Sequence, residues 1–339
     1  MSASKPLCVT LSRGDRVESE HQAALAVVER SSRVVAVAGD VDRFAYFRSS
    51  AKPFQAMPLV TSGAADAFGF TDSELAFCCS SHNGQADQQE AVVAMLGKIG
   101  AGVEQLRCGA AFPLDPAEAA RRTLGLVPAT PLQNCCSGKH TGMIATCLHL
   151  GYPVESYLDR DHPLQQEILA NVAAAMQRDP ASIALAIDGC SVPTFGAGTI
   201  DFARSFSALA DPAQAPSERI QSQQAAISRL LTAMGTYPEN IAGKGSLDTE
   251  LMRLSGGSVV AKMGAEGLLC MALPAQGIGI AIRMFDGTYR GLNILAVRAL
   301  EQLQLVEPEM ISAMRSELIA PITNANDWVV GEYDTNLAL

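Results

Sequence analysis

The chain has 339 residues, of which 48% are hydrophobic and 18% are charged, so it can supply a large buried core. A chain of this length is expected to form two lobes or two domains rather than one small module. Its 35 acidic and 25 basic residues give a net charge of −10, which argues against nucleic acid and anionic membranes as partners because both need a concentrated basic face.

The elements predicted first along the chain are strands. Apolar-rich segments at residues 6–12, 23–29 and 33–38, separated by polar turns near residues 13–15 and 31–32, predict an antiparallel meander. A helix is expected to begin at Ser49, with Pro53 in its first turn and apolar residues continuing to Val60.

Helical patterns dominate the middle of the chain, and strand patterns return near its end. The predicted helices cover residues 87–98, 116–124, 139–150, 163–177, 217–234, 291–305 and 309–318. The predicted later strands cover residues 184–188, 258–262, 268–273, 278–284 and 328–332, and residues 210–218 are expected to form a surface loop.

This order of elements predicts an α+β fold in which an antiparallel sheet, shared by the two chain ends, is flanked by helices. We expect one domain over residues 1–339, with a sheet lobe of about residues 1–50 and 240–339 and a largely helical lobe of about residues 51–239.

The sequence predicts a cytoplasmic protein. Residues 1–6 have no signal-peptide pattern, and the most apolar window, residues 267–285, is broken by Pro274, Gln276 and glycines, so it predicts two core strands and a turn rather than a membrane span. Nine cysteines, an odd number with two adjacent pairs, predict buried free thiols rather than a disulfide framework.

Ser49 and Lys52 form the first candidate catalytic pair. Positions i and i+3 lie on one face of a helix, so the hydroxyl and the amine can meet. A neutral lysine could then remove the serine proton and activate the nucleophile. The spacing alone is weak evidence, because Ser49 is equally suited to be a helix N-cap.

Two downstream motifs strengthen that hypothesis. Ser81-His82-Asn83 supplies Ser-x-Asn, and Lys262-Met263-Gly264 supplies Lys-x-Gly in a strand context. This is the motif order of penicillin-binding proteins and serine β-lactamases, in which a second serine and lysine complete the proton relay and a strand edge forms part of the oxyanion site. Met263 replaces the usual hydroxyl residue, so we interpret the match as a shared layout.

A third cluster combines cysteines with a lysine. Cys136 and Lys139 lie in a glycine-rich segment that opens a helix, and Cys190 follows Asp188 in a polar turn after a strand. If these residues converge, two thiolates would suit zinc. The alternative is a pair of buried cysteines beside a helix N-terminus.

Together these segments resemble the asparaginase II family of the rhizobial type, from about residue 7 to the chain end. The segments that carry the resemblance are Arg48-Ser49-Ser50-Ala51-Lys52-Pro53-Phe54-Gln55, Ser81-His82-Asn83-Gly84, Cys136-Ser137-Gly138-Lys139-His140, His162-Pro163-Leu164-Gln165, Asp188-Gly189-Cys190 and Gly264-Ala265-Glu266-Gly267.

The resemblance implies a homodimeric enzyme that releases ammonia from L-asparagine, with a fold like that of serine β-lactamases, penicillin-binding proteins and glutaminases. It pairs Ser49 with Lys52 and Ser81 with Lys262, and it makes Cys136, Lys139 and Cys190 a zinc site. Asp188, together with Arg48, His82 and Asn83, is assigned to substrate binding. We favour Ser49 as the nucleophile, with Ser81 as the alternative.

The sequence also departs from the family pattern. Gln22 and Ala23 follow His21 where the family tends to carry arginine and glycine, Ser246 stands where an arginine is expected, and Arg283 stands where lysine is more usual. A β-lactamase-like or peptidase-like hydrolase is the alternative enzyme, and a non-catalytic amino-acid sensor is the alternative outside enzymes. The preference between asparagine and glutamine is left open.

Overall fold

The computed structural model describes residues 6–30 and 32–339, so residues 1–5 and Ser31, which belongs to a predicted turn, lie outside the described part. Its strands are β1 (Leu7–Arg13), β2 (Arg16–Glu29), β3 (Arg33–Ala38), β4 (Phe44–Tyr46), β5 (Ala184–Ile187), β6 (Pro193–Gly198), β7 (Val260–Gly264), β8 (Leu268–Leu273), β9 (Ile278–Met284), β10 (Ile322–Thr323), β11 (Val329–Gly331) and β12 (Tyr333–Thr335).

The α-helices are α1 (Lys52–Thr61), α2 (Ala64–Ala67), α3 (Asp72–Cys78), α4 (Ala86–Lys98), α5 (Pro116–Leu124), α6 (Ser137–Leu150), α7 (Pro163–Met176), α8 (Thr199–Ala210), α9 (Glu218–Ser222), α10 (Gln224–Thr236), α11 (Glu239–Ala242), α12 (Leu247–Leu254), α13 (Leu292–Gln302) and α14 (Pro308–Leu318). Short 3₁₀ turns include η1 (Arg48–Ala51), η2 (Val103–Gln105), η3 (Pro131–Gln133), η4 (Val154–Ser156), η5 (Pro180–Ser182) and η6 (Pro212–Gln214).

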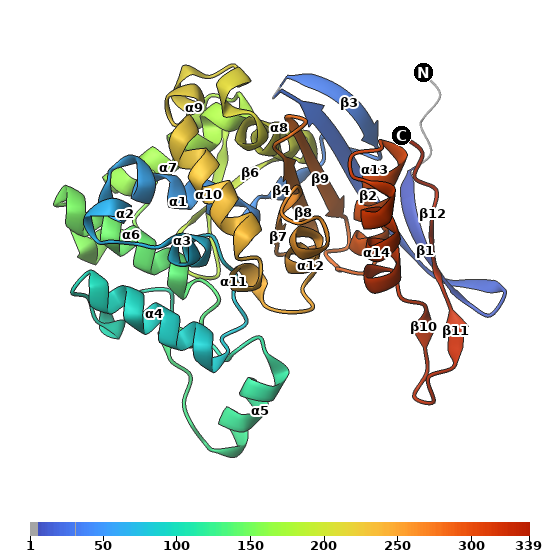
Figure 1. Cartoon of the computed structure of the whole chain (residues 1–339), viewed down its shortest axis with the longest axis horizontal. Helices are drawn as coiled ribbons and strands as arrows, with labels where there is room; N and C mark the ends of the chain where they lie inside the picture. The colour runs from blue at the N-terminus through green and yellow to red at the C-terminus, as the bar shows by residue number, and fades with distance from the viewer. Residues whose placement is uncertain (1–5, 31) are drawn as a thin grey trace.

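The main sheet is antiparallel and joins both ends of the chain. Its order is β12-β1-β2-β9-β8-β7, with β3 also paired to β2, so the predicted meander and the shared sheet are confirmed. Figure 1 shows this sheet on one side of the molecule and the helices of the middle of the chain gathered on the other. The fold is α+β, as predicted.

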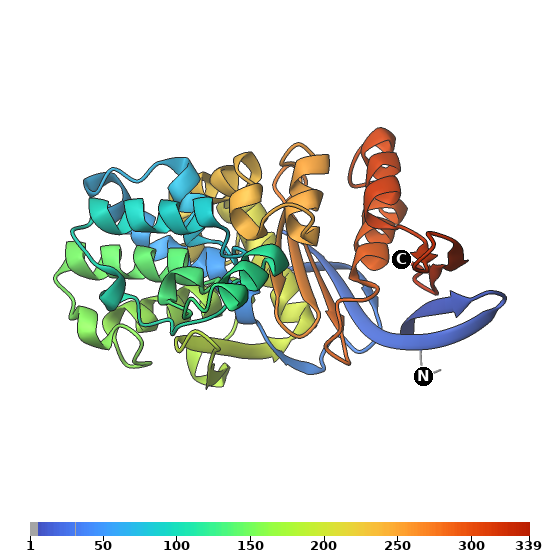
Figure 2. The same ribbon diagram turned by 90° about the horizontal axis from the view of Figure 1, so that it is seen from below.

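The central strands are continuous apolar runs because helices cover them. The second half of β2, together with β8 and β9, is almost wholly buried, and α8 packs against all three strands while α13 packs on β9. A strand covered on both faces needs no polar alternation. Figure 2, which looks from below, shows the strands running between helices.

Several local predictions were wrong or incomplete. Ser49 is not a helix N-cap: it lies inside η1, and α1 begins only at Lys52, without a side-chain cap. The helix predicted over 217–234 is divided into α9 and α10, and the 210–218 loop contains η6. The terminal strand β11 pairs with β10 in a small separate sheet rather than with the main sheet.

Strand β7 is the edge of the main sheet and brings its end against η1. A Cβ atom built on Gly264 would lie 2.9 Å from Ser50 Oγ and 3.0 Å from the Phe47 carbonyl oxygen. The Ser50 hydroxyl also donates to the Lys262 carbonyl oxygen at 2.9 Å. Glycine at this position therefore allows the strand with Lys262 to touch the turn with Ser49.

Candidate active site

The η1 turn presents Ser49 between two buried anchors. Phe47 stacks on Phe202 with ring centroids 4.6 Å apart, and its N–H donates to the Phe195 carbonyl. Ala51 is buried on the other side, whereas Ser49 itself is partly exposed. Packing of the flanking apolar residues therefore leaves Ser49 as a partly exposed residue between two buried ones.

Arg48 enters the same turn with a strained backbone. Its φ of +49° lies in the left-handed region, which non-glycine residues seldom adopt without a compensating interaction. The guanidinium Nε donates to Asp188 Oδ1 at 2.7 Å, and the Arg48 N–H donates to Thr194 Oγ1 at 3.2 Å. Two residues predicted to bind substrate thus form one ion pair beside Ser49.

Lys52 is fully buried and contacts Ser81 rather than Ser49. Its Nζ lies 2.8 Å from Ser81 Oγ and 3.3 Å from the Cys135 carbonyl oxygen, and it also bonds the Ser80 carbonyl oxygen. Within the described part of the chain, the Ser49 hydroxyl makes no hydrogen bond. The structure therefore joins Lys52 to the second serine, which differs from the predicted Ser49–Lys52 pairing.

The three contacts of Lys52 are compatible with both protonation states of its amine. Carbonyl oxygens can only accept, so the contacts to Ser80 and Cys135 each use an N–H of Lys52. A hydroxyl can donate or accept, so the Ser81 contact holds either a third N–H or the lone pair of a neutral amine.

Ser81, His82 and Asn83 follow α3 in an extended segment. The Ser81 N–H donates to the Ile241 carbonyl at 2.6 Å, which fixes the segment beside α11. His82 is completely buried, accepts the Gly84 N–H on Nδ1 at 3.1 Å and contacts Ser137 Oγ with Nε2 at 2.8 Å. Burial, helped by the nearby Lys52 charge, lowers the pKa of His82 to about 4.

His82 and Asn83 therefore occupy different places. Both ring nitrogens of His82 are bound by protein groups, so this geometry supports a role in holding the segment and gives no support to direct substrate contact. The Asn83 side chain is partly exposed and lies against Gly243, where it remains a predicted substrate contact.

Lys262 on β7 pairs with a carboxylate that the sequence analysis did not assign. Its Nζ donates to Asp248 Oδ2 at 3.3 Å and to the Met263 carbonyl at 3.0 Å, and both side chains are buried. Burial lowers the pKa of the Lys262 amine, and the Asp248 carboxylate opposes that effect. Among the described residues, Lys262 makes its side-chain ion pair with Asp248 and no hydrogen bond with Ser81, so the Ser81–Lys262 pairing stays a prediction.

The predicted metal ligands come together at the start of α6. Lys139 Nζ lies 3.0 Å from Cys190 Sγ, and the Cys136 thiol lies 3.9 Å from the Cys135 thiol. Hydrogen bonds from Cys135 and Cys190 lower the pKa of Cys136 against the effect of burial. Burial alone would lower the pKa of Lys139, but its interactions with Cys190, Cys136 and Asp188 outweigh burial and raise that pKa, while the hydrogen bond to Cys136 and burial raise the pKa of Cys190 itself.

The chemistry of this donor set fits zinc. Two sulfur donors and an amine from two separate segments form a buried cluster, and zinc accepts both sulfur and nitrogen ligands. Lys139 would have to give up a proton to bind a metal, as metal ligands generally do. Over the described residues, no group of three or more His, Cys, Asp or Glu side chains is placed to hold a metal ion.

All nine cysteines are free thiols, and seven of them are buried. None of the helices in the described ranges is long and apolar enough to cross a membrane.

Comparison with known proteins now places this site in a family. The L-asparaginase II family model matches residues 9–335, which is nearly the whole chain. This chain belongs to the L-asparaginase II family. Membership supports amidohydrolase activity, and the matched range includes all the candidate site residues from Arg48 to Lys262.

Solved structures resemble this chain only weakly, both in sequence and in backbone geometry. Mglu is 15% identical, with 84% of this chain and 61% of that chain covered and a TM-score of 0.45, so this chain spans about three fifths of the length of Mglu. A Bacillus glutaminase is 11% identical, with 84% and 92% covered and a TM-score of 0.43. A candidate β-lactamase from Bacteroides dorei DSM 17855 is 12% identical, with 82% and 92% covered and a TM-score of 0.45. No curated protein matches.

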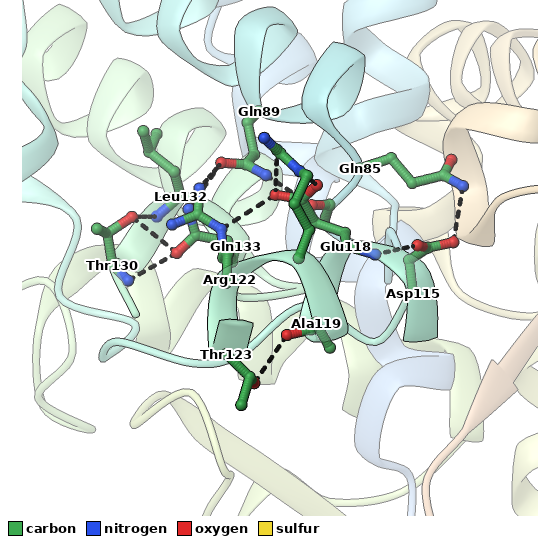
Figure 3. A network of polar contacts seen from close by, with 12 residues as sticks. Gln85, Gln89, Asp115, Glu118, Ala119, Arg122, Thr123, Thr130, Leu132 and Gln133 are labelled. Atoms are coloured by element: carbon green, nitrogen blue, oxygen red, sulfur yellow. Dashed lines mark hydrogen bonds and ion pairs between the residues drawn. The ribbon is translucent and has the colours of Figure 1, made fainter. Parts of the chain in front are cut away.

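In this L-asparaginase II family member, a polar network braces the loops that carry the site (Figure 3). Gln89 on α4 donates to the Gly84 carbonyl at 2.6 Å and accepts from Gln133 at 2.7 Å. Arg122 on α5 donates to Gln89 at 3.1 Å and to Glu118 at 3.0 Å. The network therefore ties the segment after Ser81 to the segment before Cys135.

Proposed function

We propose that this protein is an L-asparagine amidohydrolase that produces L-aspartate and ammonia through a serine nucleophile. The observation that carries the proposal is the 2.8 Å contact between Lys52 Nζ and Ser81 Oγ, beside the partly exposed Ser49. Membership of the L-asparaginase II family supports the choice of substrate.

The chemistry follows from these positions. Ser49 Oγ attacks the side-chain amide carbon, and its proton enters the Lys52–Ser81 pair. Within the described residues the Ser49 N–H has no hydrogen-bond partner, so it is available to the oxygen that becomes negative in the tetrahedral intermediate. The pair then protonates the departing nitrogen as ammonia, and water hydrolyses the serine ester to aspartate.

The amino-acid end of the substrate would meet Arg48 and Asp188. A guanidinium matches a carboxylate, and a carboxylate matches an ammonium group, so this ion pair is complementary to a zwitterion. The 2.7 Å hydrogen bond between Arg48 and Asp188 fixes the orientation of both side chains in the absence of substrate.

A bound zinc ion would be held by Cys136, Lys139 and Cys190 and would supply a fixed positive charge that positions the substrate. Asp188 lies close enough to influence the charge of Lys139, which supports a positioning role near the substrate end. We expect chelation to raise KM more than it lowers kcat for asparagine. Complete loss of kcat with unchanged KM after metal removal would contradict this role.

The test of the proposed function is ammonia release from L-asparagine and L-glutamine by wild type, Ser49→Ala and Ser81→Ala. We expect wild type to release ammonia from asparagine and Ser49→Ala to lose the reaction. Ser50→Ala is the matched control, because its hydroxyl bonds the Lys262 carbonyl and not the substrate side of the turn. No ammonia from asparagine with the wild-type protein would overturn the proposal.

The identity of the nucleophile is tested by trapping the acyl-enzyme and locating the adduct by peptide mass spectrometry. We expect the adduct on the peptide that contains Ser49. An adduct on the Ser81 peptide would instead make the Lys52–Ser81 pair the nucleophilic unit, which their direct hydrogen bond also allows. L-Asparagine and L-glutamine differ by one methylene group. A binding pocket can discriminate such a difference by only about 1–3 kcal/mol, so the ratio of the two activities has to be measured.

Turnover of nitrocefin would favour the β-lactamase-like alternative. Binding of asparagine without ammonia release would favour the amino-acid sensor. The homodimer and the cytoplasmic location stay predictions, and light scattering at several protein concentrations tests the first of them.

A further inference from the structure

The η1 turn leaves a β-ladder at a defined point. Strand β4 pairs with β6 as far as Tyr46, and the Phe47 N–H continues the same register by donating to the Phe195 carbonyl oxygen at 2.7 Å. The next pair in this register would be Arg48 and Thr194. The ladder stops there, because Phe47 already has helical dihedral angles (φ −66°, ψ −31°) and η1 begins at Arg48.

A side-chain hydroxyl takes the place of the missing ladder partner. Thr194 Oγ1 accepts the Arg48 N–H at 3.2 Å, and Thr194 is only 3% exposed. Thr194 is itself well fixed, because β6 is the central strand of the three-stranded sheet and pairs with β4 on one side and β5 on the other. Removal of this hydroxyl would leave the Arg48 N–H without a partner in a largely buried place, which is costly.

The backbone conformation of Arg48 needs such support. Its φ of +49° lies in the left-handed region, which favours glycine. Gln177 and Gln304 also have positive φ values, but they lie at or just beyond the end of a helix, where this conformation is a common way to end the helix. Arg48 begins a helical turn instead. A strained residue of this kind persists only where the surrounding contacts fix it.

The backbone and the side chain of Arg48 are held by different residues. The Arg48 dihedral angles set the direction of the planar peptide group that carries the Ser49 N–H, and therefore the position of Ser49 itself. Thr194 holds this backbone, whereas Asp188 holds the guanidinium through the 2.7 Å hydrogen bond to Nε. The two contacts of Arg48 therefore act on different ends of the proposed substrate.

We propose that Thr194 is a positioning residue whose hydroxyl holds Arg48 in its left-handed conformation and thereby sets the orientation of Ser49. This inference rests on the proposed serine amidohydrolase function. In this role Thr194 does not touch the substrate. Turnover therefore depends on the Thr194 hydroxyl, while affinity for the amino-acid end of the substrate depends on the Arg48–Asp188 ion pair.

The first experiment measures kcat and KM for asparagine in wild type, Thr194→Val and Thr194→Ser. Valine keeps the branched shape without the hydroxyl, and serine keeps the hydroxyl. We expect Thr194→Val to lower kcat about tenfold or more with KM changed by less than about twofold, and Thr194→Ser to recover most of kcat. Wild-type kcat in Thr194→Val, or a serine variant no better than the valine variant, would overturn the proposal.

Thr199→Val is the matched control. Thr199 is also buried and directly follows the end of β6, but its hydroxyl has no hydrogen-bond partner among the described residues. The same replacement there removes no contact, so we expect the kinetic constants of wild type. A fall in kcat as large as that of Thr194→Val would mean that any change at this end of the small sheet disturbs the site, and the proposal would be wrong.

The second experiment tests the strained backbone by placing Thr194→Val in two backgrounds, Arg48→Ala and Arg48→Gly. Both backgrounds lack the guanidinium, but only glycine adopts the left-handed conformation without strain. We expect Thr194→Val to lower kcat at least about threefold more in the alanine background than in the glycine background. Equal reductions in the two backgrounds would show that the hydroxyl does not support a strained residue.

The third experiment needs no substrate and follows amide hydrogen exchange by NMR of ¹⁵N-labelled protein. We expect the Arg48 N–H to exchange about tenfold faster in Thr194→Val and at the wild-type rate in Thr194→Ser. The Phe47 N–H, which donates to a backbone carbonyl, is the internal reference. Unchanged exchange of the Arg48 N–H in Thr194→Val would overturn the proposal.

These measurements separate the role of Thr194 from the proposed function. Absence of ammonia release by wild type would overturn the amidohydrolase assignment, while amide exchange would still show whether Thr194 holds the Arg48 backbone. If Thr194→Val does not fold, Thr194→Ala removes the same hydroxyl with a smaller side chain and carries the same expectations.

Discussion

The buried lysines of the active site and Arg121 of the neighbouring arm both place a charged side chain beside a loop, but at opposite degrees of burial. We define the α5 arm as residues 109–130, which Figure 1 shows extending away from the body of the molecule. Lys52 and Lys262 are 0% exposed, whereas the side chain of Arg121 in the arm is 67% exposed. Leu124 and Leu126, in the same arm, are 86% and 90% exposed.

The difference shows where charge is used for chemistry and where it is used for local order. A buried charge interacts strongly with each of its few partners, and loss of one partner leaves a group that water cannot reach. An exposed ion pair is screened by water, so its loss changes the free energy of unfolding little. Substitutions in the site should therefore have large and specific effects, and those in the arm small and local ones.

The largest expected effect comes from Lys52→Met, which removes the amine but keeps the length of the side chain. We expect ammonia release from asparagine to fall by about 10³-fold, because general acid–base groups contribute roughly 10²–10⁴-fold. Lys98→Met is the control, since Lys98 pairs with Glu74 in an exposed position and should retain activity. A folded Lys52→Met protein with near-normal turnover would show that the site works without this amine.

His82 should produce the next largest effect, as a dependence of stability on pH. Its pKa is about 4 in the folded protein because of burial, against an ordinary value of 6.5. The unfolded chain binds the extra proton between these values, so the free energy of unfolding falls as pH drops from about 6.5 towards 4, by at most about 3 kcal/mol. Urea unfolding at pH 7 and pH 4.5 measures this loss.

The variant His82→Gln should flatten that dependence, whereas His149→Gln should not, because His149 is exposed at the end of α6. An identical slope in wild type and His82→Gln would show that other groups carry the acid sensitivity. The neutral imidazole of His82 would then contribute less to the stability of the Ser81 segment than its hydrogen bonds suggest.

The smallest expected effects belong to the arm. Hydrogen bonds from Arg121 lower the pKa of Glu118, so Glu118→Gln removes a charge that three arginine nitrogens share. We expect faster amide hydrogen exchange over residues 115–130 with little change in global unfolding. Arg121→Ala should change exchange even less, because its side chain is mostly in water. Global destabilisation by either variant would show that the arm is part of the core.

Much of the fold was predictable because its elements carry strong patterns. The meander of β1–β3, the hairpins among β7–β9 and the helices α4, α6 and α7 have clear periodicity or continuous apolar runs. The helices α3, α8 and α12 were missed. In α8 the polar residues that usually mark a surface helix are few, because both its neighbours and the main sheet bury it.

The sequence supplied a set of candidate site residues, but not the contacts that those residues make. Ser49, Lys52, Ser81 and Lys262 came from motif order, which carries no information on which amine faces which serine. Asp248 was missed because it meets Lys262 through a helix and a strand that pack together, and spacing along the chain does not encode that contact. The Arg48–Asp188 bond links residues 140 positions apart and was likewise unavailable to pattern reading.

The contact of Ser50 with the Lys262 carbonyl joins residues 212 positions apart, from a turn near the start of the chain to the edge strand of the sheet. During synthesis Ser49 and Lys52 leave the ribosome long before strand β7, which completes their surroundings. Chains grow at about 5–20 residues per second, so tens of seconds of elongation separate the two halves. The surroundings of Ser49 and Lys52 are therefore complete only after β7, with Lys262, has been made and has docked against η1.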